Sequence, residues 1–315
     1  MPAYNAARTI DAAIRSVLAQ TRGDFELIVV DDGSSDDTVD RAQRFASDGR
    51  VQVIRQRNSG PGAARNRAIR SGRGQYVSML DSDDLWLPEY LETMAAILDR
   101  DSELGFAYTN AWVLDDATRR IRKTSAMHYQ HPPRDPPRDP AAFLELLLRR
   151  GNFVFTSTTV RREVLERVGL FEAALMPAED YGLWLRIVAS GFGAARTATN
   201  LAVYRKHPGS LSTNERAILE GERASVCRIL EEFDIPVHAR RLAHARLRRL
   251  DDLLAAHYEE KGLRPALARA RARAVRAKIA LVEPFAWLRE PPPEVAALLA
   301  AAYADDDRPR VDTNA

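Results

Sequence analysis

The sequence predicts an α/β fold in which a mostly parallel central sheet is flanked by helices, followed by a helical C-terminal region. Between residues 25 and 98, short apolar runs alternate with amphipathic stretches, and the links between them are short. The run Phe25 to Val30 is continuously apolar, which is the pattern of a strand buried on both faces. Strands and helices that alternate in this way form parallel sheets.

The composition of the 315-residue chain is that of a globular protein. Hydrophobic residues make up 45% and charged residues 29%, which is unlike a disordered or a membrane-spanning protein. A net charge of +2 provides no overall field for nucleic acid, so no nucleic-acid partner is expected. The single cysteine, Cys227, excludes an internal disulfide and a cysteine-based zinc site. With no signal-peptide pattern after Met1 and no apolar run of about 18 residues, we expect a cytoplasmic protein.

The first hundred residues supply the alternating elements in order. Thr9 to Gln20 is expected to be a helix, because its apolar residues share one face and Thr9 is a suitable N-cap. Pro61 and Pro88 are expected at helix starts, where proline is favoured. The other elements expected here are strands at 25–30, 51–57 and 76–80, with helices at 37–46 and 88–98.

The alternation loosens after Asp99. We expect strands at 104–109, 153–160 and 194–205, a hairpin of 112–114 with 119–123, and helices at 141–148 and 178–188. The segment His131 to Pro140 is expected to be a surface loop, either a linker or a border of the acceptor site. Its five prolines prevent regular hydrogen-bonded structure.

From Asn214 the chain becomes rich in Ala and Arg and shows no strand pattern. We expect helices at 216–232, 237–258 and 264–282, and a short last helix after the prolines 291–293. The predicted organisation is a domain of residues 1–212, a helical appendage of 213–304 and a disordered tail of 305–315.

Basic residues outnumber acidic ones from Arg240 to Lys278. This excess fits peripheral contact with the inner face of an anionic membrane, where a lipid-linked acceptor would sit. A solvated helix face explains the same charges.

Three carboxylates follow the apolar run that ends at Leu80: those of Asp81, Asp83 and Asp84. They repel one another unless a cation or hydrogen-bond donors hold them together. One reading is a divalent metal that carries a phosphorylated ligand; the other is an acidic turn before the helix at Pro88. Asp31 and Asp32 end another predicted strand, so both acidic stretches are expected on the ligand-binding rim of the sheet. This agreement favours the metal.

Six motifs together resemble those of the family 2 glycosyltransferases with a GT-A fold. The resemblance covers residues 1–212, and the motifs occur in the family's order. They are Pro2-Ala3-Tyr4-Asn5, Val29-Val30-Asp31-Asp32-Gly33-Ser34, the segment Asn58 to Asn66, Leu80-Asp81-Ser82-Asp83-Asp84, Glu179-Asp180 and Tyr204-Arg205-Lys206-His207. Each is weak alone, but their combination at these spacings is specific.

The resemblance implies an inverting transferase that moves a sugar from a nucleotide-diphosphate sugar to an acceptor hydroxyl in surface polysaccharide or glycan biosynthesis. It favours a UDP-sugar donor and a glycan or lipid-linked acceptor. It implies that Tyr4 stacks near the base, that Asp32 hydrogen-bonds the base and that Asp81 lies near the ribose. The further donor-binding candidates from these motifs are Pro2, Asn5, Asn58, Gly62, Arg65 and Ser82.

The resemblance also implies a metal and a base. Asp83 would ligate Mg²⁺ or Mn²⁺ bridging the diphosphate, and His207 would reach the metal or the diphosphate. Asp180 would be the general base that takes the acceptor proton.

Each assignment has a plainer structural alternative. Asp32 also fits a turn cap, Tyr4 a core residue, and Arg65 a solvated surface charge. Glu179 and Asp180 also fit a pair that stabilises a helix N-terminus. Gly62 is better explained as a residue that permits a tight backbone conformation than as one that contacts the ligand directly.

One departure from the family concerns the first residues. The family has an apolar strand immediately before the motif that here starts at Pro2, and the absence of a central strand would leave backbone groups unpaired. We therefore expect that the natural chain extends upstream of Met1.

Two other functions remain open at this point. A metal-dependent phosphatase would use Asp81 as its nucleophile, but it leaves Tyr4, Asp32 and Asp180 without a role. A non-catalytic nucleotide-sugar-binding subunit would keep its function after an Asp180→Asn substitution.

Overall fold

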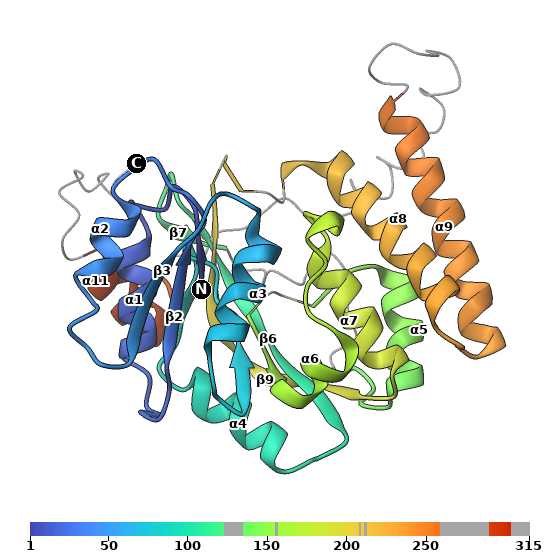
Figure 1. Ribbon diagram of the computed structural model, residues 1–315, viewed down its shortest axis with the longest axis horizontal. Coiled ribbons are helices and arrows are strands. Elements are labelled where there is room, and N and C mark those ends of the chain that lie inside the picture. The colour runs from blue at the N-terminus through green and yellow to red at the C-terminus, as the bar shows by residue number, and fades with distance from the viewer. Residues whose placement is uncertain (123–134, 155–156, 208, 211–212, 259–289, 304–315) are drawn as a thin grey trace.

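The structure is a computed structural model that describes residues 1–122, 135–154, 157–207, 209–210, 213–258 and 290–303 (Figure 1). It confirms the α/β class. The predicted helix at 264–282, the tail at 305–315 and part of the proline-rich segment lie outside the described residues. The predicted division at residue 212 and the predicted upstream strand stay predictions.

A three-stranded parallel sheet comes first. Its strands β1 (Pro2–Ala3), β2 (Leu27–Asp31) and β3 (Val51–Arg55) lie in the order β1-β2-β3. Every residue of β2 is buried, as its continuous apolar run predicted. Helices α1 (Ile10–Leu18) and α2 (Thr38–Gln43) lie on one side of this sheet and α3 (Pro61–Ser71) on the other (Figure 1).

Thr9 is the N-cap residue of α1, as predicted, but its side chain forms no hydrogen bond with the helix amides. The Thr9 hydroxyl donates to the Ala6 carbonyl oxygen instead of accepting an amide hydrogen of the helix. The backbone turn at Ala6 therefore starts this helix without a side-chain cap. A genuine cap occurs at Asp139, whose carboxylate accepts from the Ala142 amide at 2.8 Å.

A six-stranded mixed sheet follows. Its order is β4-β8-β6-β9-β5, and β7 pairs with β6. The parallel pairing expected for most of the sheet occurs here only between β6 and β9, whereas the other described pairs of this sheet are antiparallel. The strands are β4 (Tyr76–Ser78), β5 (Leu85–Trp86), β6 (Leu104–Asp115), β7 (Arg120–Ile121), β8 (Thr158–Arg161) and β9 (Gly193–Lys206).

The predicted hairpin is confirmed, since Leu114 pairs with Ile121. The break predicted after Thr109 was wrong, because β6 continues through it. The register between β6 and β9 shifts around Asn110, so a local irregularity accommodates the polar residues within one long strand.

The remaining helices pack around these sheets. They are α4 (Tyr90–Asp99), α5 (Pro140–Arg150), α6 (Arg162–Val168), the short η2 (Ala173–Leu175), α7 (Glu179–Ala189), α8 (Glu215–Glu232), α9 (Val237–Tyr258) and α11 (Pro293–Ala302). Of these, α6 was not predicted, and the strand expected at 153–160 is described only as the shorter β8.

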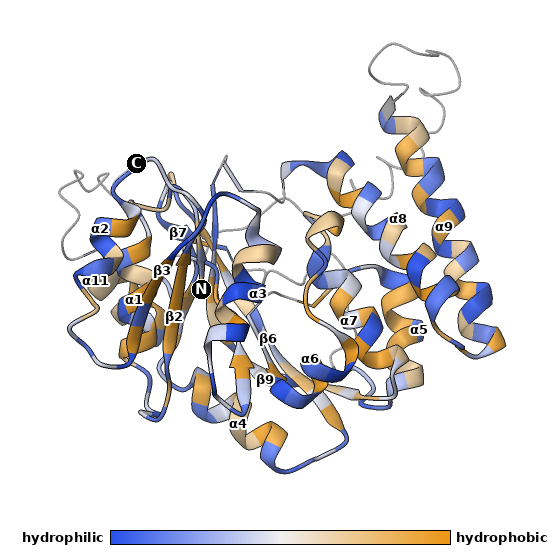
Figure 2. Ribbon diagram, viewed as in Figure 1, coloured by the Kyte–Doolittle hydropathy of each residue, from blue (hydrophilic) through white to orange (hydrophobic). Residues whose placement is uncertain are grey.

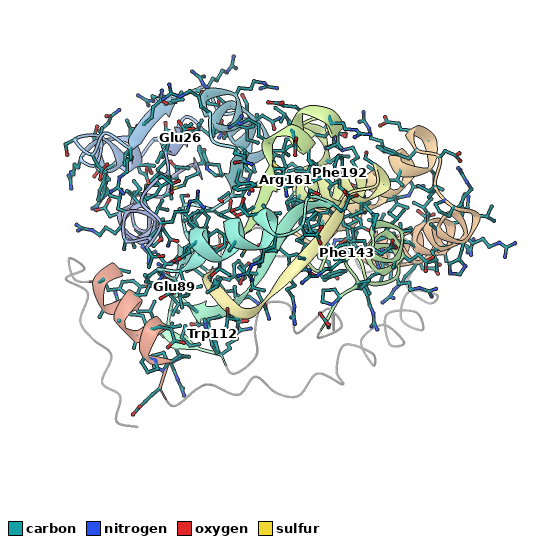
Figure 3. All side chains as sticks on the ribbon, turned by 90° about the horizontal axis from the view of Figure 1, so that it is seen from below. Glu26, Glu89, Trp112, Phe143, Arg161 and Phe192 are labelled. Carbon is teal, nitrogen blue, oxygen red and sulfur yellow. The ribbon has the colours of Figure 1, made fainter. Side chains whose placement is uncertain are left out.

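One core joins the mixed sheet to helices α5, α7, α8 and α9. Phe143 of α5, labelled in Figure 3, meets Phe106 of β6 edge to face with ring centroids 5.9 Å apart. Val226 of α8 and Ala243 of α9 belong to the same core. Hydrophobic residues are concentrated on β2 and β3, as Figure 2 shows. Helices α8 and α9 therefore share the core of the mixed sheet.

A cavity of about 400 Å³ lies between the two sheets. Side chains of β2, α3 and β4 line it, among them Ile28, Ile69 and Val77. β1 and β4 are the edge strands of their sheets and do not pair with each other in the described part of the chain.

Candidate active site

A cleft of about 1140 Å³ follows the carboxyl ends of β1 to β4. It confirms that the two acidic stretches share a rim, because Asp32 and Asp83 both line it. The cleft brings together eleven of the residues predicted from the sequence: Pro2, Tyr4, Asn5, Asp32, Asn58, Arg65, Asp81, Ser82, Asp83, Asp180 and His207. Gly62 is the exception. It is buried on α3, and a Cβ there would lie 3.4 Å from Glu179 Cγ, so it serves close packing behind the cleft.

Tyr4 and Asn5 form one end of the cleft. Tyr4 is 54% exposed, so the alternative that it belongs to the core was wrong. Asn5 has a positive φ of 49°, its amide donates to Ser34 Oγ at 2.9 Å, and its Oδ1 accepts from the Ser35 amide at 2.9 Å. Asn5 thereby anchors the turn after β2 and leaves the Tyr4 ring free for a ligand.

Asp32 accepts three hydrogen bonds from its own chain. Its Oδ1 accepts from Gln56 Nε2 at 2.7 Å and from the Ser59 amide at 2.9 Å, and its Oδ2 accepts from the Gly60 amide at 2.7 Å. The carboxylate therefore shapes the loop after β3. Gly33 completes this arrangement with φ of 77°, because a Cβ there would lie 2.9 Å from the Asn58 nitrogen.

The acidic cluster divides into three environments. Asp81 accepts from Arg65 Nη2 at 2.6 Å, and Asp83 Oδ2 lies 3.0 Å from His207 Nε2. Asp84 is 2% exposed, and its Oδ1 accepts from the Arg205 amide at 2.9 Å. Burial, and then the charges of Asp83 and Asp81, raise the pKa of Asp84 well above its usual range. Asp84 is therefore a structural member of the cluster.

Asp83 and His207 fit a divalent cation by their chemistry. Both line the cleft and are partly exposed, and the hydrogen bond to Asp83 raises the pKa of His207. Carboxylate oxygen and imidazole nitrogen are ligands of Mn²⁺ and, for the oxygen, of Mg²⁺. In the described part of the chain, no three side chains of His, Cys, Asp or Glu form a complete ligand set. Water and diphosphate oxygens would supply the rest.

Arg65 connects the two acidic sides of the cleft. Its Nη1 donates to Glu179 Oε1 at 2.6 Å, and its Nη2 donates to Asp81. The Arg65 side chain is 8% exposed, so the alternative of a solvated surface charge was wrong. These two ion pairs join α3 to the start of α7, and the guanidinium separates the carboxylates of Asp81 and Glu179.

Asp180 is the second residue of α7, where the helix N-terminus faces the cleft. Its Oδ1 accepts from the Tyr181 amide at 2.7 Å, and its Oδ2 accepts from Asn152 Nδ2 at 3.0 Å. Burial, and then the neighbouring Glu179 charge, raise the pKa of Asp180 to about 7. A carboxylate with a pKa near neutrality in a cleft is suited to take a proton from a hydroxyl.

Sequence reasoning missed several residues of this cleft, including Asn152, Met176, Ile218 and Glu222. Asn152 follows the C-terminus of α5 and contacts Asp180 from a position 28 residues away. No local pattern marks any of the four. Their positions depend on how α5, α7 and α8 pack together.

An α/β fold with an acidic cleft at the strand ends suits a glycosyltransferase, and comparison with known proteins identifies this class. The chain belongs to glycosyl transferase family 2, whose family model matches residues 1–169. It is 29% identical over 218 residues to UDP-Glc:alpha-D-GlcNAc-diphosphoundecaprenol beta-1,3-glucosyltransferase WfaP of Escherichia coli, covering 68% of this chain and 78% of that protein. It is 32% identical to succinoglycan biosynthesis protein ExoO of Rhizobium meliloti, covering 90% of this chain and 80% of that protein. Relatives of this chain thus act in polysaccharide biosynthesis.

Solved structures share the fold. TarS 1–349 of S. aureus superposes with a TM-score of 0.63 at 18% identity, covering 88% of this chain and 78% of TarS 1–349. The mannosyltransferase PcManGT of Pyrobaculum calidifontis, solved with GDP-Man and Mn²⁺, gives a TM-score of 0.58 at 20% identity, covering 96% of this chain and 84% of that one. These likenesses confirm the GT-A fold.

Proposed function

We propose that this glycosyltransferase moves a sugar from a nucleotide-diphosphate sugar to an acceptor hydroxyl with inversion of the anomeric carbon. The observation that carries the proposal is the position of Asp180. A carboxylate with a pKa near 7 lines the same cleft as Asp83 and His207, which suit a cation and a diphosphate. One cleft therefore offers a base for the acceptor and ligands for the leaving group.

The donor nucleotide is assigned to the end of the cleft formed by β1 to β3. Tyr4 offers an exposed ring for stacking on a base. Asp32 fixes the loop of Ser59 and Gly60. The edge of the nucleotide base would lie against this loop. A UDP-sugar is favoured, since WfaP is named for UDP-Glc.

The residues for metal and diphosphate are Asp83 and His207, with Asp81 and Ser82 beside them. A Mg²⁺ or Mn²⁺ held there would stabilise the negative charge that develops on the departing diphosphate. The presence of Mn²⁺ in the PcManGT complex supports this assignment.

The transfer itself needs one displacement. The acceptor oxygen forms a bond to the anomeric carbon while the bond from that carbon to the diphosphate oxygen breaks. The hydroxyl proton passes to the Asp180 carboxylate, and the nucleoside diphosphate leaves with the electron pair. Asn152 holds the carboxylate in place through its hydrogen bond to Oδ2.

The phosphatase alternative is disfavoured by the geometry at Asp81. Its Oδ1 is held by the buried Arg65, so the carboxylate is oriented by an ion pair within the protein. The family match points to sugar transfer as well. A non-catalytic nucleotide-sugar-binding subunit would have no need of a base, so it does not account for the raised pKa of Asp180.

The proposed acceptor is a lipid-linked sugar, in line with the diphosphoundecaprenol substrate in the name of WfaP. No helix among the described residues is both long and apolar enough to cross a membrane. Exposed Arg241, Arg248 and Arg249 on α9 offer a basic face for peripheral binding at the inner surface. Co-sedimentation with vesicles should rise with the fraction of anionic lipid, and binding that is independent of that fraction would remove this part of the proposal.

A screen of nucleotide-sugars tests the donor assignment. Each donor is added with Mg²⁺ or Mn²⁺, and thermal unfolding and release of nucleoside diphosphate are followed. We expect at least one donor, with UDP-sugars first, to stabilise the protein in a metal-dependent way. A flat response to every donor in the presence of metal would contradict the proposal.

A further inference from the structure

Helix α8 reaches the cleft from outside the segment that the family model matches. That match ends at residue 169, whereas α8 begins at Glu215. Ile218 and Glu222, one turn apart on α8, line the cleft together with Asp180 and Asn152. α8 lies beside α7, on the far side of the molecule from β2 and β3 (Figure 1). Ile218 and Glu222 therefore bring α8 to the cleft.

Two glycines hold α8 close to this position. A Cβ at Gly221 of α8 would lie 2.6 Å from the Leu175 carbonyl oxygen, and a Cβ at Gly182 of α7 would lie 2.8 Å from Leu175 Cδ1. Ser225 packs at the same crossing, 3.1 Å from that second Cβ position. Such backbone contact leaves α8 little room to shift, so Ile218 and Glu222 are fixed at the cleft.

Met176 lines the cleft beside Gly60 of the loop after β3. It is 42% exposed, and its Sδ lies 3.0 Å from the position of a Cβ on Gly60. The exposed Met176 and the partly buried Ile218 provide apolar surface in the cleft that also contains the carboxylates of Asp180 and Glu222. The apolar face of a sugar ring suits such a surface, and its hydroxyls suit the carboxylates beside it.

Glu222 brings a charge to this surface. Its side chain is 8% exposed, and Oε2 accepts from Arg246 of α9. The Arg246 guanidinium packs against Gly151, whose φ is 81° and whose neighbour Asn152 donates to Asp180. A buried ion pair contributes little net stability, because desolvation offsets the attraction. The position of Glu222 in the cleft fits a role in ligand binding.

We propose that α8 forms the acceptor wall of the cleft. Met176 and Ile218 contact the apolar face of the acceptor sugar, and Glu222 accepts a hydrogen bond from one of its hydroxyls. This orients a second hydroxyl toward Asp180. The inference rests on the proposed function, and it assigns acceptor selection to a helix beyond the matched family segment.

Steady-state kinetics of matched variants test this wall. Ile218→Ala and Glu222→Gln are compared with Leu219→Ala and Glu220→Gln, which alter α8 residues that do not line the cleft. The donor is UDP-glucose, and the acceptor is chosen as the best substrate of the wild-type protein among short-chain alkyl esters of monosaccharide diphosphates, including α-D-GlcNAc diphosphate. We expect the two cleft variants to raise the acceptor KM about tenfold and the donor KM less than about twofold. The controls should leave both constants unchanged.

A further variant covers the case in which Glu222→Gln fails to fold, as thermal unfolding will show. The larger side chain of Ile218→Trp would occupy the space proposed for the acceptor sugar. This variant should therefore abolish acceptor binding, while UDP-glucose still binds in calorimetry. Equal changes in donor and acceptor KM, or cleft variants that match the controls, would overturn the inference. A wild-type protein that binds no nucleotide-sugar and transfers to no acceptor would instead overturn the proposed function.

Discussion

Arg65 and Glu179, which lie 114 residues apart in the chain, form a buried ion pair at 2.6 Å in the wall of the cleft. Arg65 also holds Asp81, so one guanidinium orients a carboxylate of the donor side and the residue before the proposed base. Glu179 Oε2 and Arg65 Nε are buried without a hydrogen-bond partner among the described residues. The pair therefore joins the two halves of the site at a cost in desolvation.

The first prediction concerns the removal of this guanidinium. Arg65→Met leaves the buried Glu179 carboxylate unpaired, which should lower the free energy of unfolding by about 3 kcal/mol or more. Urea unfolding measures it, with Arg67→Met on the exposed face of α3 as the control. Equal stability of the two variants would show that Arg65 is not needed to hold the site together.

The second prediction concerns pH. Asp180 must be ionised to take a proton, so transfer should rise with pH and reach half its maximum near pH 7, where the raised pKa of Asp180 lies. The hydrogen bond from Asn152 lowers that pKa, so Asn152→Ala should move the midpoint to higher pH. The pH profiles of kcat for both proteins measure this. A midpoint near pH 4, or a downward shift in the variant, would argue against Asp180 as the base.

The third prediction concerns the loop after β3. Asp32→Ala removes the acceptor of three hydrogen bonds, so the Ser59 and Gly60 amides lose their partner. We expect a loss of about 1–3 kcal/mol in stability and a weaker affinity for UDP. Unfolding and calorimetry measure these effects, and Asp40→Ala on the exposed side of α2 is the control. Unchanged UDP affinity would mean that this loop does not shape the nucleotide end.

The fourth prediction concerns the metal. EDTA should abolish transfer, and Mn²⁺ or Mg²⁺ should restore it. Asp83→Ala and His207→Ala should each raise the metal concentration needed for half-maximal activity by about tenfold or more, whereas Asp24→Ala at an exposed site should not. Full activity in EDTA would contradict a metal at Asp83 and His207.

Local pattern predicted much of the fold. The continuous apolar run of β2, the amphipathic stretch of α7 and the long α8 and α9 all formed where expected. The seven residues of α6 are too few to show a periodic face, and it was missed. The polar Thr109 and Asn110 suggested a break in β6, but pairing with β9 overrides their weak strand preference.

The site was predictable only in part. Asp32 and Asp83, which follow predicted strands, could be expected on one rim because parallel topology brings strand ends together. Tyr4 was expected at the site only from its family motif. The partner of Arg65 and the contacts of Asn152 and Glu222 could not be predicted, since they arise from packing between elements distant in the chain. The position of α8 depends on glycine contacts that no periodicity reveals.

The central claim is that Asp180 is the base of a sugar transfer from a nucleotide-sugar. Its most direct test compares wild type and Asp180→Asn in two measurements, donor binding by calorimetry and transfer to an acceptor. We predict that the variant binds the donor within about twofold of wild type while its kcat falls by about a hundredfold or more. Transfer by Asp180→Asn at the wild-type rate, with donor binding intact, would contradict the account.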